Sequence, residues 1–305
     1  MSVADSIPRG ERLEPPTLAE VLAALEALWP RSLAESWDAV GPVAGRPEAP
    51  VRRILWAVDP VRAVAREAVE REVDLVVTHH PLLLRGVTSV AAVGTPSAAK
   101  GDVLHTLIEH RIGLVAAHTN ADAALGGVSD AIARRLGLTD VVPLLPARDA
   151  GPGEGIGRVG VLPEPLALRV FAERVACILP ATAGGVRVAG DADAPIRRVA
   201  LCGGAGDGLF EAVRAVDADV YLTSDLRHHP ASEARETALL GDGRPALVDV
   251  AHWAAESLWL EDGAAALATE LGAAGRAAEM IVSTRVTDPW DFHVTSTPST
   301  ERTMP

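Results

Sequence analysis

The chain has 305 residues, of which 48% are hydrophobic and 23% are charged, so it can bury a substantial core as one large domain or two smaller ones. Its formal net charge of -13 argues against non-specific binding to nucleic acid or to anionic membranes, because both reward a positive surface. Its two cysteines are too few for a disulfide framework, which fits a reducing, cytoplasmic location.

The two ends of the chain are predicted to be flexible tails, residues 1–16 and 288–305. The first 16 residues are polar and contain prolines, and they lack the apolar stretch of a secretory signal. No run of 18 or more uncharged apolar residues occurs, so we expect no membrane span.

The first half of the chain, residues 17–146, alternates helices and strands. Thr17 and Glu20 form a capping-box pattern that predicts a helix to about residue 28, ended by Pro30. Short apolar runs rich in branched residues indicate buried strands. The further elements predicted here are strands at 53–58, 74–78 and 113–117 and helices at 60–71, 97–111 and 128–137.

The Pro/Gly-rich run at 147–157 predicts a hinge, followed by a second half, residues 158–287, with the same alternation. Strands alternating with helices favour an α/β fold with a largely parallel sheet covered on both faces. The elements predicted here are strands at 160–162, 198–202, 219–223, 246–250 and 280–286 and helices at 165–179 and 251–271.

Four of these predicted strands end in side chains that commonly bind metals. Ligands of open parallel sheets bind outside the carboxyl ends of the strands, so we expect the four clusters to meet at one edge. The clusters are His79 and His80; His118 and Asp122; Asp225, His228 and His229; and His252 and Glu256.

Each cluster has a simpler interpretation. The pair His79 and His80 is often a surface turn, but here it follows a buried strand and precedes Pro81. His252 and Glu256 lie one helical turn apart, a spacing that also occurs in solvated helix contacts. Asp122 has an alternative role as a helix cap.

Two further features have open alternatives. His228 is expected at the rim of the site rather than among the ligands, and Asp225 has the same capping alternative as Asp122. The Gly-rich run 203–208 could cradle a phosphate at a helix start, but it lacks the G-x-G-x-x-G pattern, and a tight turn is favoured.

The ligand types favour particular metals. Imidazole and carboxylate groups without thiolate suit Zn, Fe, Mn or Co. Five ligands exceed the need of one tetrahedral ion, whereas two divalent ions bridged by the Glu256 carboxylate would use them all. Such a pair makes water acidic and polarises carbonyl or phosphoryl groups, which indicates hydrolysis. Asp225, His118 and His229 are the candidates for moving protons.

Six motifs in order resemble the NIF3-like family, which is also catalogued as GTP cyclohydrolase 1 type 2 homologues. The resemblance covers roughly residues 17–287, and all five ligand positions hold the expected residue type. The motifs are WDAVG (37–41), THHPL (78–82), HTNAD (118–122), GGVSD (126–130), TSDLRHH (223–229) and DVAHWAAE (249–256). The departure is Ser224, where glycine is expected before the acidic residue.

The resemblance implies an α/β fold of two similar halves with the metal site at their interface, assembled as a toroidal homohexamer. It implies that His79 and Asp122 hold one metal, that His80 and His252 hold the other, and that Glu256 bridges them. The stretch between Asp122 and His252 is too short for the CutA-like domain that some relatives insert between the halves, so we expect the compact form. The cyclohydrolase name implies hydrolytic attack on the guanine ring of GTP. We therefore expect a metal-dependent hydrolase of a nucleotide-like or other small substrate; the alternative is a metal-binding hexameric scaffold without turnover.

Overall fold

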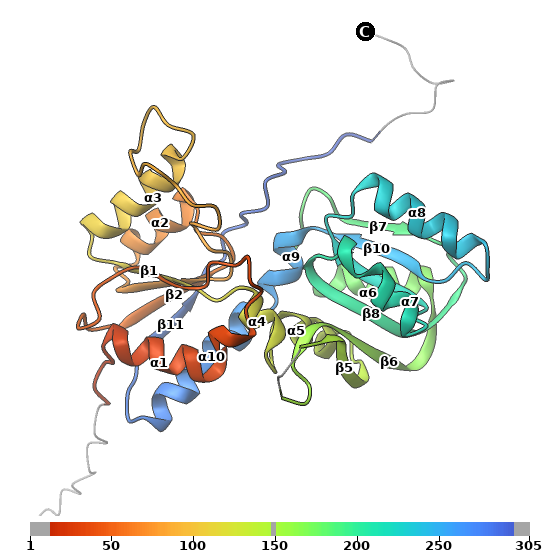
Figure 1. The fold of residues 1–305 in the computed structure, drawn as a ribbon, viewed down its shortest axis with the longest axis horizontal. Helices are drawn as coiled ribbons and strands as arrows, with labels where there is room; N and C mark the ends of the chain where they lie inside the picture. Colours follow the sequence, from red (N-terminus) through yellow and green to blue (C-terminus); the bar gives the residue numbers. More distant parts are fainter. Residues whose placement is uncertain (1–12, 148–150, 296–305) are drawn as a thin grey trace, which may run out of the picture.

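The computed structural model describes residues 13–147 and 151–295, which form two mixed α/β layers joined through shared helices (Figure 1). The ten helices of this described part are α1 (Leu18–Leu28), α2 (Arg62–Glu70), α3 (Ala98–Glu109), α4 (Thr119–Ala123), α5 (Val128–Arg135), α6 (Leu168–Ile178), α7 (Phe210–Ala215), α8 (His228–Leu239), α9 (His252–Ser257) and α10 (Leu260–Ala273). Its strands are β1 (Gly41–Ala44), β2 (Arg53–Ala57), β3 (Leu75–Thr78), β4 (Gly113–Ala116), β5 (Thr139–Pro146), β6 (Gly155–Ala167), β7 (Val186–Ala189), β8 (Pro195–Ala205), β9 (Val220–Ser224), β10 (Ala246–Val250) and β11 (Glu279–Val282).

The first sheet has the strand order β1-β4-β3-β2-β11 and is parallel except for the edge strand β1. Alternate residues of its strands face two different cores, as the two-residue repeat of a strand requires. Leu55 of β2 packs with α2 and α3 on one face, whereas Ile54 and Trp56 pack with α1 and α10 on the other. The predicted capping box at Thr17 and Glu20 is confirmed at the start of α1.

The second sheet has the order β5-β6-β8-β9-β10-β7, and only β8, β9 and β10 pair in parallel. The prediction of a largely parallel sheet is therefore confirmed for the first sheet and only in part for the second. The predicted hinge at 147–157 falls between β5 and β6, which pair antiparallel, so this run connects two neighbouring strands of one sheet. Its residues 148–150 lie outside the described residues.

The C-terminal part of the chain returns to the first sheet. The helix predicted at 251–271 is divided near Leu258 and Trp259 into α9 and α10, and α10 packs against α1. β11 then pairs in parallel with β2. The sheets thus do not follow the division into 17–146 and 158–287, because the last elements of the second segment complete the first sheet (Figure 1).

The two ends differ in what the structure describes. Of the predicted tails, residues 1–12 and 296–305 lie outside the described residues. Glu14 forms an isolated bridge with Arg276, and residues from Thr287 to His293 line a cavity between the two layers. Across residues 13–147 and 151–295, no helix is long and apolar enough to cross a membrane.

Candidate metal centre

The first two candidate ligands are held where β3 ends. The His79 amide donates to the Ala57 carbonyl at 3.1 Å and the His80 amide donates to the Val58 carbonyl at 2.9 Å, so the parallel pairing with β2 continues past Thr78. His79 is fully buried, and its Nδ1 lies 2.9 Å from the carbonyl oxygen of Ala117. This carbonyl therefore holds the proton on Nδ1 and leaves Nε2 as the atom that faces the site.

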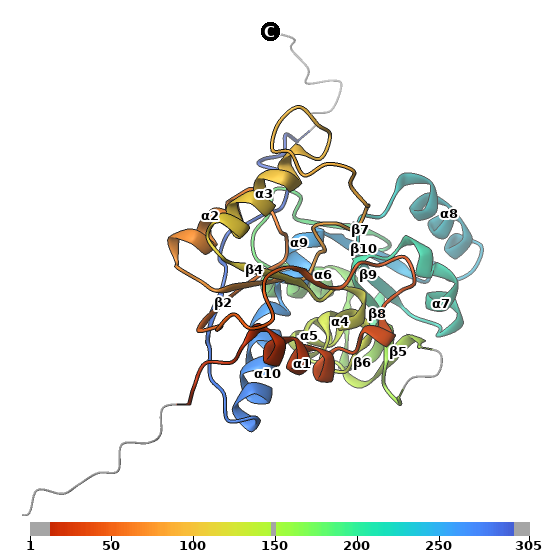
Figure 2. The same cartoon turned by 60° about the vertical axis from the view of Figure 1, so that its left-hand side comes forward.

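The other candidate ligands come from short helices that follow β4 and β10. His118 immediately precedes α4, which carries Asp122, and α9 begins at His252 and carries Glu256 one turn later. α9 lies between the two layers (Figure 1 and Figure 2), and its Glu256 side chain contacts His79 and His80 just after β3. The expected convergence of distant strand ends is therefore realised for three of the four clusters.

The Glu256 carboxylate lies at the centre of the cluster and is 3% exposed. Its Oε1 is 2.8 Å from His252 Nε2 and 3.4 Å from His79 Nε2, and its Oε2 is 3.0 Å from His80 Nε2. Asp122 Oδ1 lies 3.8 Å from His79 Nε2. One carboxylate thus faces three imidazole nitrogens, with a second carboxylate beside them.

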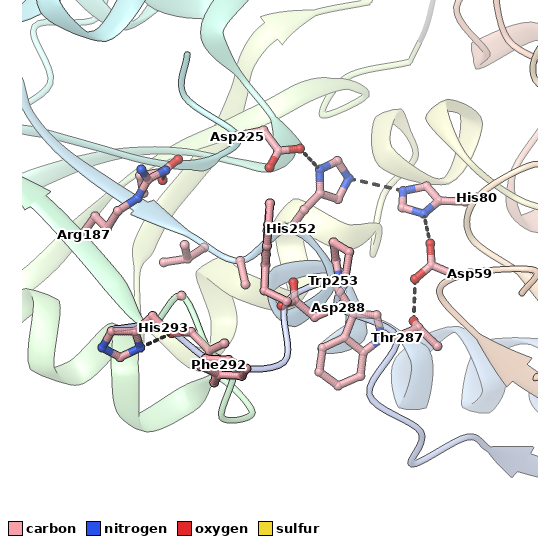
Figure 3. Close-up of a pocket in the computed structure, with 18 of the residues that line it drawn as sticks. Asp59, His80, Arg187, Asp225, His252, Trp253, Thr287, Asp288, Phe292 and His293 are labelled. Atoms are coloured by element: carbon pink, nitrogen blue, oxygen red, sulfur yellow. Dashed lines mark hydrogen bonds and ion pairs between the residues drawn. The ribbon is translucent and has the colours of Figure 1, made fainter. Parts of the chain in front are cut away.

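Two carboxylates outside the cluster orient two of its rings. Asp59 Oδ1 lies 2.7 Å from His80 Nδ1, and Asp225 Oδ2 lies 2.7 Å from His252 Nδ1 (Figure 3). Each pair fixes the ring and favours the proton on Nδ1, as carboxylates do behind metal-binding histidines. The two Nε2 atoms then face each other at 3.2 Å, an arrangement in which two lone pairs repel unless a cation lies beside them.

The electrostatics of the cluster also favour positive charge at this point. Burial opposes protonation of both rings, but the Glu256 carboxylate and the orienting carboxylates raise the pKa of His80 to about 10 and that of His252 to about 11. Burial likewise opposes ionisation of Glu256, yet the three surrounding imidazoles hold its pKa well below its ordinary value. Burial raises the pKa of Asp122. A bound cation would replace the protons that this site otherwise attracts.

Unpartnered polar atoms test whether these residues fit a metal. His79 Nε2, Asp122 Oδ1 and Glu256 Oε2 are shielded from solvent, and none of them forms a hydrogen bond of acceptable geometry, although His80 Nε2 lies 3.0 Å from Glu256 Oε2. Buried polar atoms without partners are uncommon and costly. Since all three point into one cluster and belong to ordinary ligand types for Zn, Fe or Mn, the residues fit a metal centre.

Gly204 leaves room for the Glu256 carboxylate. Its φ is +77°, and a Cβ there would lie 2.7 Å from Glu256 Oε1 and 3.3 Å from His252 Nε2. The neighbouring carbonyls are held in place, because the Thr223 hydroxyl donates to Gly204 and the Tyr221 hydroxyl donates to Gly206. The Gly-rich run 203–208 is therefore the end of β8 and the start of a short 3-10 helix behind the cluster, and not the tight turn that the sequence favoured.

The three residues that were predicted to move protons lie in different places relative to the cluster. His118 lies inside the cluster, with ligand atoms of His79, His80 and His118 within 4.8 Å of one another. Asp225 contacts His252 from behind, so its position suits orienting that ring. His229 is exposed at the start of α8 and stacks edge-on with His228, apart from the cluster.

Two carboxylates of the site were not singled out from the sequence. Asp59 follows the strand predicted at 53–58, so the strand-end argument could have included it. Asp38 belongs to the WDAVG motif, and its carboxylate lies 2.9 Å from His118 Nδ1 and accepts from the Thr119 amide and hydroxyl at 3.0 and 2.5 Å. These hydrogen bonds, opposed only by burial, hold the pKa of Asp38 well below its ordinary value.

Comparisons with known proteins show which family the chain belongs to. A family model described as Duf34/NIF3 (NGG1p interacting factor 3) matches residues 16–289. A Streptomyces coelicolor protein named GTP cyclohydrolase 1 type 2 homolog is 53% identical over 285 residues, covering 93% of this chain and 97% of that protein. A Streptococcus pneumoniae protein of the same name is 30% identical and covers 90% of this chain and 98% of its own length.

Solved structures show the same fold. Staphylococcus aureus hypothetical protein SA1388 superposes with a TM-score of 0.81 at 27% identity, covering 92% of this chain and all of that one. A Bacillus cereus protein related to NIF3 also gives a TM-score of 0.81, at 22% identity. With a family model that spans most of its length and relatives that match almost end to end, the chain belongs to the Duf34/NIF3 family.

Proposed function

We propose that this chain holds two divalent metal ions, drawn from Zn, Fe and Mn. His79 and Asp122 would hold one ion, His80 and His252 the other, and Glu256 would bridge them. The observation that carries the proposal is the convergence of unpartnered buried ligand atoms on one point, with carboxylates placed behind two of the imidazoles.

We further propose that the centre serves a metal-dependent hydrolase of a nucleotide-like or other small substrate. Two bound ions supply an acidic water and polarise a carbonyl, phosphoryl or ring C=N group. His118, whose Nδ1 is held by Asp38, is placed to take up or release a proton at Nε2. The printed name of the curated relatives, GTP cyclohydrolase 1 type 2 homolog, makes a guanine nucleotide the first substrate to test.

Turnover tests this proposal. Metal-loaded protein is incubated with GTP and a panel of phosphoesters, beside Glu256→Ala and the matched control Glu261→Ala, which removes an exposed carboxylate at the start of α10. We expect turnover by the native protein and the control but not by Glu256→Ala. Metal-loaded native protein without turnover of any of these substrates would count against the hydrolase and favour a metal-binding scaffold.

The assembly and location form a separate proposal. We propose a cytoplasmic homohexamer, as the family resemblance implies. Sedimentation equilibrium of the purified protein measures the assembly directly: six times the 31.7 kDa chain mass is expected, and a monomer would contradict it.

A further inference from the structure

A large cavity opens beside the metal-facing histidines. It has a volume of about 920 Å³, which is the size of known small-molecule sites. His80, His252 and their orienting carboxylates lie on one side of it (Figure 3). Its other side is formed by the segment Thr287–His293, which we call the C-terminal strap.

The strap is attached at both ends. At its start, the Thr287 hydroxyl donates to Asp59 Oδ2 at 2.5 Å, and the other oxygen of the same carboxylate holds His80. At its end, His293 Nδ1 lies 2.7 Å from the carbonyl oxygen of Ala183, in the loop before β7. The strap therefore crosses from the first sheet to the second layer along the wall of the cavity.

Two aromatic side chains of the strap are largely exposed. Trp290 is 71% exposed and Phe292 is 78% exposed, and both line the cavity together with the buried Trp253. Exposed apolar side chains that lie together, unlike single scattered ones, mark interaction sites or ligand-binding grooves. Flat rings of this kind stack on nucleobases and similar heterocycles.

The strap also offers an unsatisfied acceptor. Asp288 lines the cavity, and its Oδ2 is shielded from solvent without any hydrogen-bond partner. The other cavity carboxylates are engaged, because Asp59 holds His80, Asp225 holds His252, and Asp249 is paired with Arg187. Rotation of the Asp288 side chain would turn this oxygen from its shielded position toward the cavity, where an N–H group of a ligand would satisfy it.

We propose that the C-terminal strap is the specificity-determining wall of this site, and that it selects ligands with a flat nitrogen heterocycle bearing N–H donors. The ring stacks on Trp290 and Phe292, its N–H edge faces Asp288, and the rest of the ligand extends toward His80 and His252. The proposal rests on the proposed function for the identity of the site. It adds residues beyond position 289, where the family match ends.

Binding tests this proposal without relying on turnover. Guanosine is the ring-bearing probe, since its edge has adjacent N–H donors, and ribose 5-phosphate is the probe without a ring. Calorimetry compares metal-loaded native protein with Trp290→Ala, Phe292→Ala and Asp288→Ala. Val294→Ala is the matched control, because Val294 is equally exposed but does not line the cavity. Metal content and elution volume are recorded for every variant.

We expect the Kd of guanosine to rise about tenfold in Trp290→Ala and in Phe292→Ala, with Val294→Ala, ribose 5-phosphate binding and metal content unchanged. Equal guanosine affinity in the native protein and the strap variants would overturn the proposal, as would strap variants that change the elution volume instead of the affinity. If guanosine binds through the strap and is never hydrolysed, the hydrolase proposal fails and the strap proposal stands.

Discussion

At the scale of single residues, the decisive contact is the 3.2 Å approach of two imidazole nitrogens, each on a ring held from behind by a carboxylate. The convergence of the five candidate ligands could be predicted, since each lies at or within one helical turn of a strand end. The orienting roles of Asp59 and Asp38 could not, because a carboxylate that contacts an imidazole across the fold leaves no pattern along the chain. For the same reason the sequence assigned Asp225 to proton transfer, whereas its contact is with His252.

Asp59→Asn tests the orienting role. The amide removes the negative charge behind His80, and loss of such partners typically weakens metal binding by about 10- to 100-fold. Metal affinity is measured by competition with a chromophoric chelator. Asp242→Asn, an exposed carboxylate paired with Arg244, is the control and should bind metal like the native protein. Unchanged metal affinity in Asp59→Asn would show that Asp59 does not support metal binding through His80.

Gly204→Ala tests the space behind the Glu256 carboxylate. The new Cβ would lie 2.7 Å from Glu256 Oε1 at a φ of +77°, so Glu256 must move and the backbone conformation itself costs about 1–2 kcal/mol. We expect a folded protein with reduced metal content. Gly208→Ala, whose Cβ meets nothing within 4 Å, is the control. Full metal content in the Gly204 variant would show that metal binding does not depend on the position that Glu256 holds beside Gly204.

At the scale of elements, the strands with continuous apolar runs and the helices beside them could be predicted, and so could the parallel strands β2, β3 and β4 at the centre of the first sheet. The edge strands β1, β5 and β7, the five-residue helix α4 and the twelve-residue helix α8 were missed. The edge strands are short or half-exposed, and such segments carry weak periodicity. The interruption between α9 and α10 was missed because the residues around Trp259 favour helix locally. Only packing shows that the break lets α9 face the cluster while α10 packs against α1.

The Arg158 side chain connects α4, α5 and β6, and this residue is 1% exposed. Its guanidinium pairs with Asp130 of α5, donates to the carbonyls of Gly155 and Gly157, and donates to Ala124 at the end of the helix that carries Asp122. Removing one partner of a buried pair costs about 3–5 kcal/mol, so Arg158→Met should lower the free energy of unfolding by about that amount.

Urea denaturation measures this loss, and the matched control is Arg52→Met. Arg52 is 63% exposed in its pair with Asp74, and such surface pairs contribute about 0–1 kcal/mol. If Arg158→Met and Arg52→Met lowered the free energy of unfolding equally, the contacts of Arg158 with α4, α5 and β6 would not have the stabilising role assigned to them.

At the scale of the whole molecule, the centre lies where the two layers meet, and one apolar cluster runs from Trp56 under the first sheet to Phe171 under the second. The alternation of strands and helices could predict an α/β fold, whereas two similar halves with the site between them were implied by the family resemblance. The alternation could not predict that the C-terminal elements complete the first sheet, because strand pairing over more than 200 residues leaves no local pattern.

Metal removal should lower the stability of the folded chain, because the centre lies between the two layers. Ions that bind only the folded chain contribute about 2.7 kcal/mol at a hundredfold excess over Kd, so chelation should lower the Tm by several degrees. Differential scanning calorimetry with and without chelator measures the change. In Glu256→Ala the chelator should have little effect; an equal shift in both proteins would place the stabilising metal elsewhere.

The number of ions per chain tests the central claim most directly. Metal-loaded, desalted protein is analysed for Zn, Fe and Mn by elemental analysis, beside Glu256→Ala and the control Glu261→Ala. We predict two ions per chain in the native protein and the control and a marked loss in Glu256→Ala. A value near zero in the native protein, or an unchanged value in Glu256→Ala, would contradict the metal centre described here.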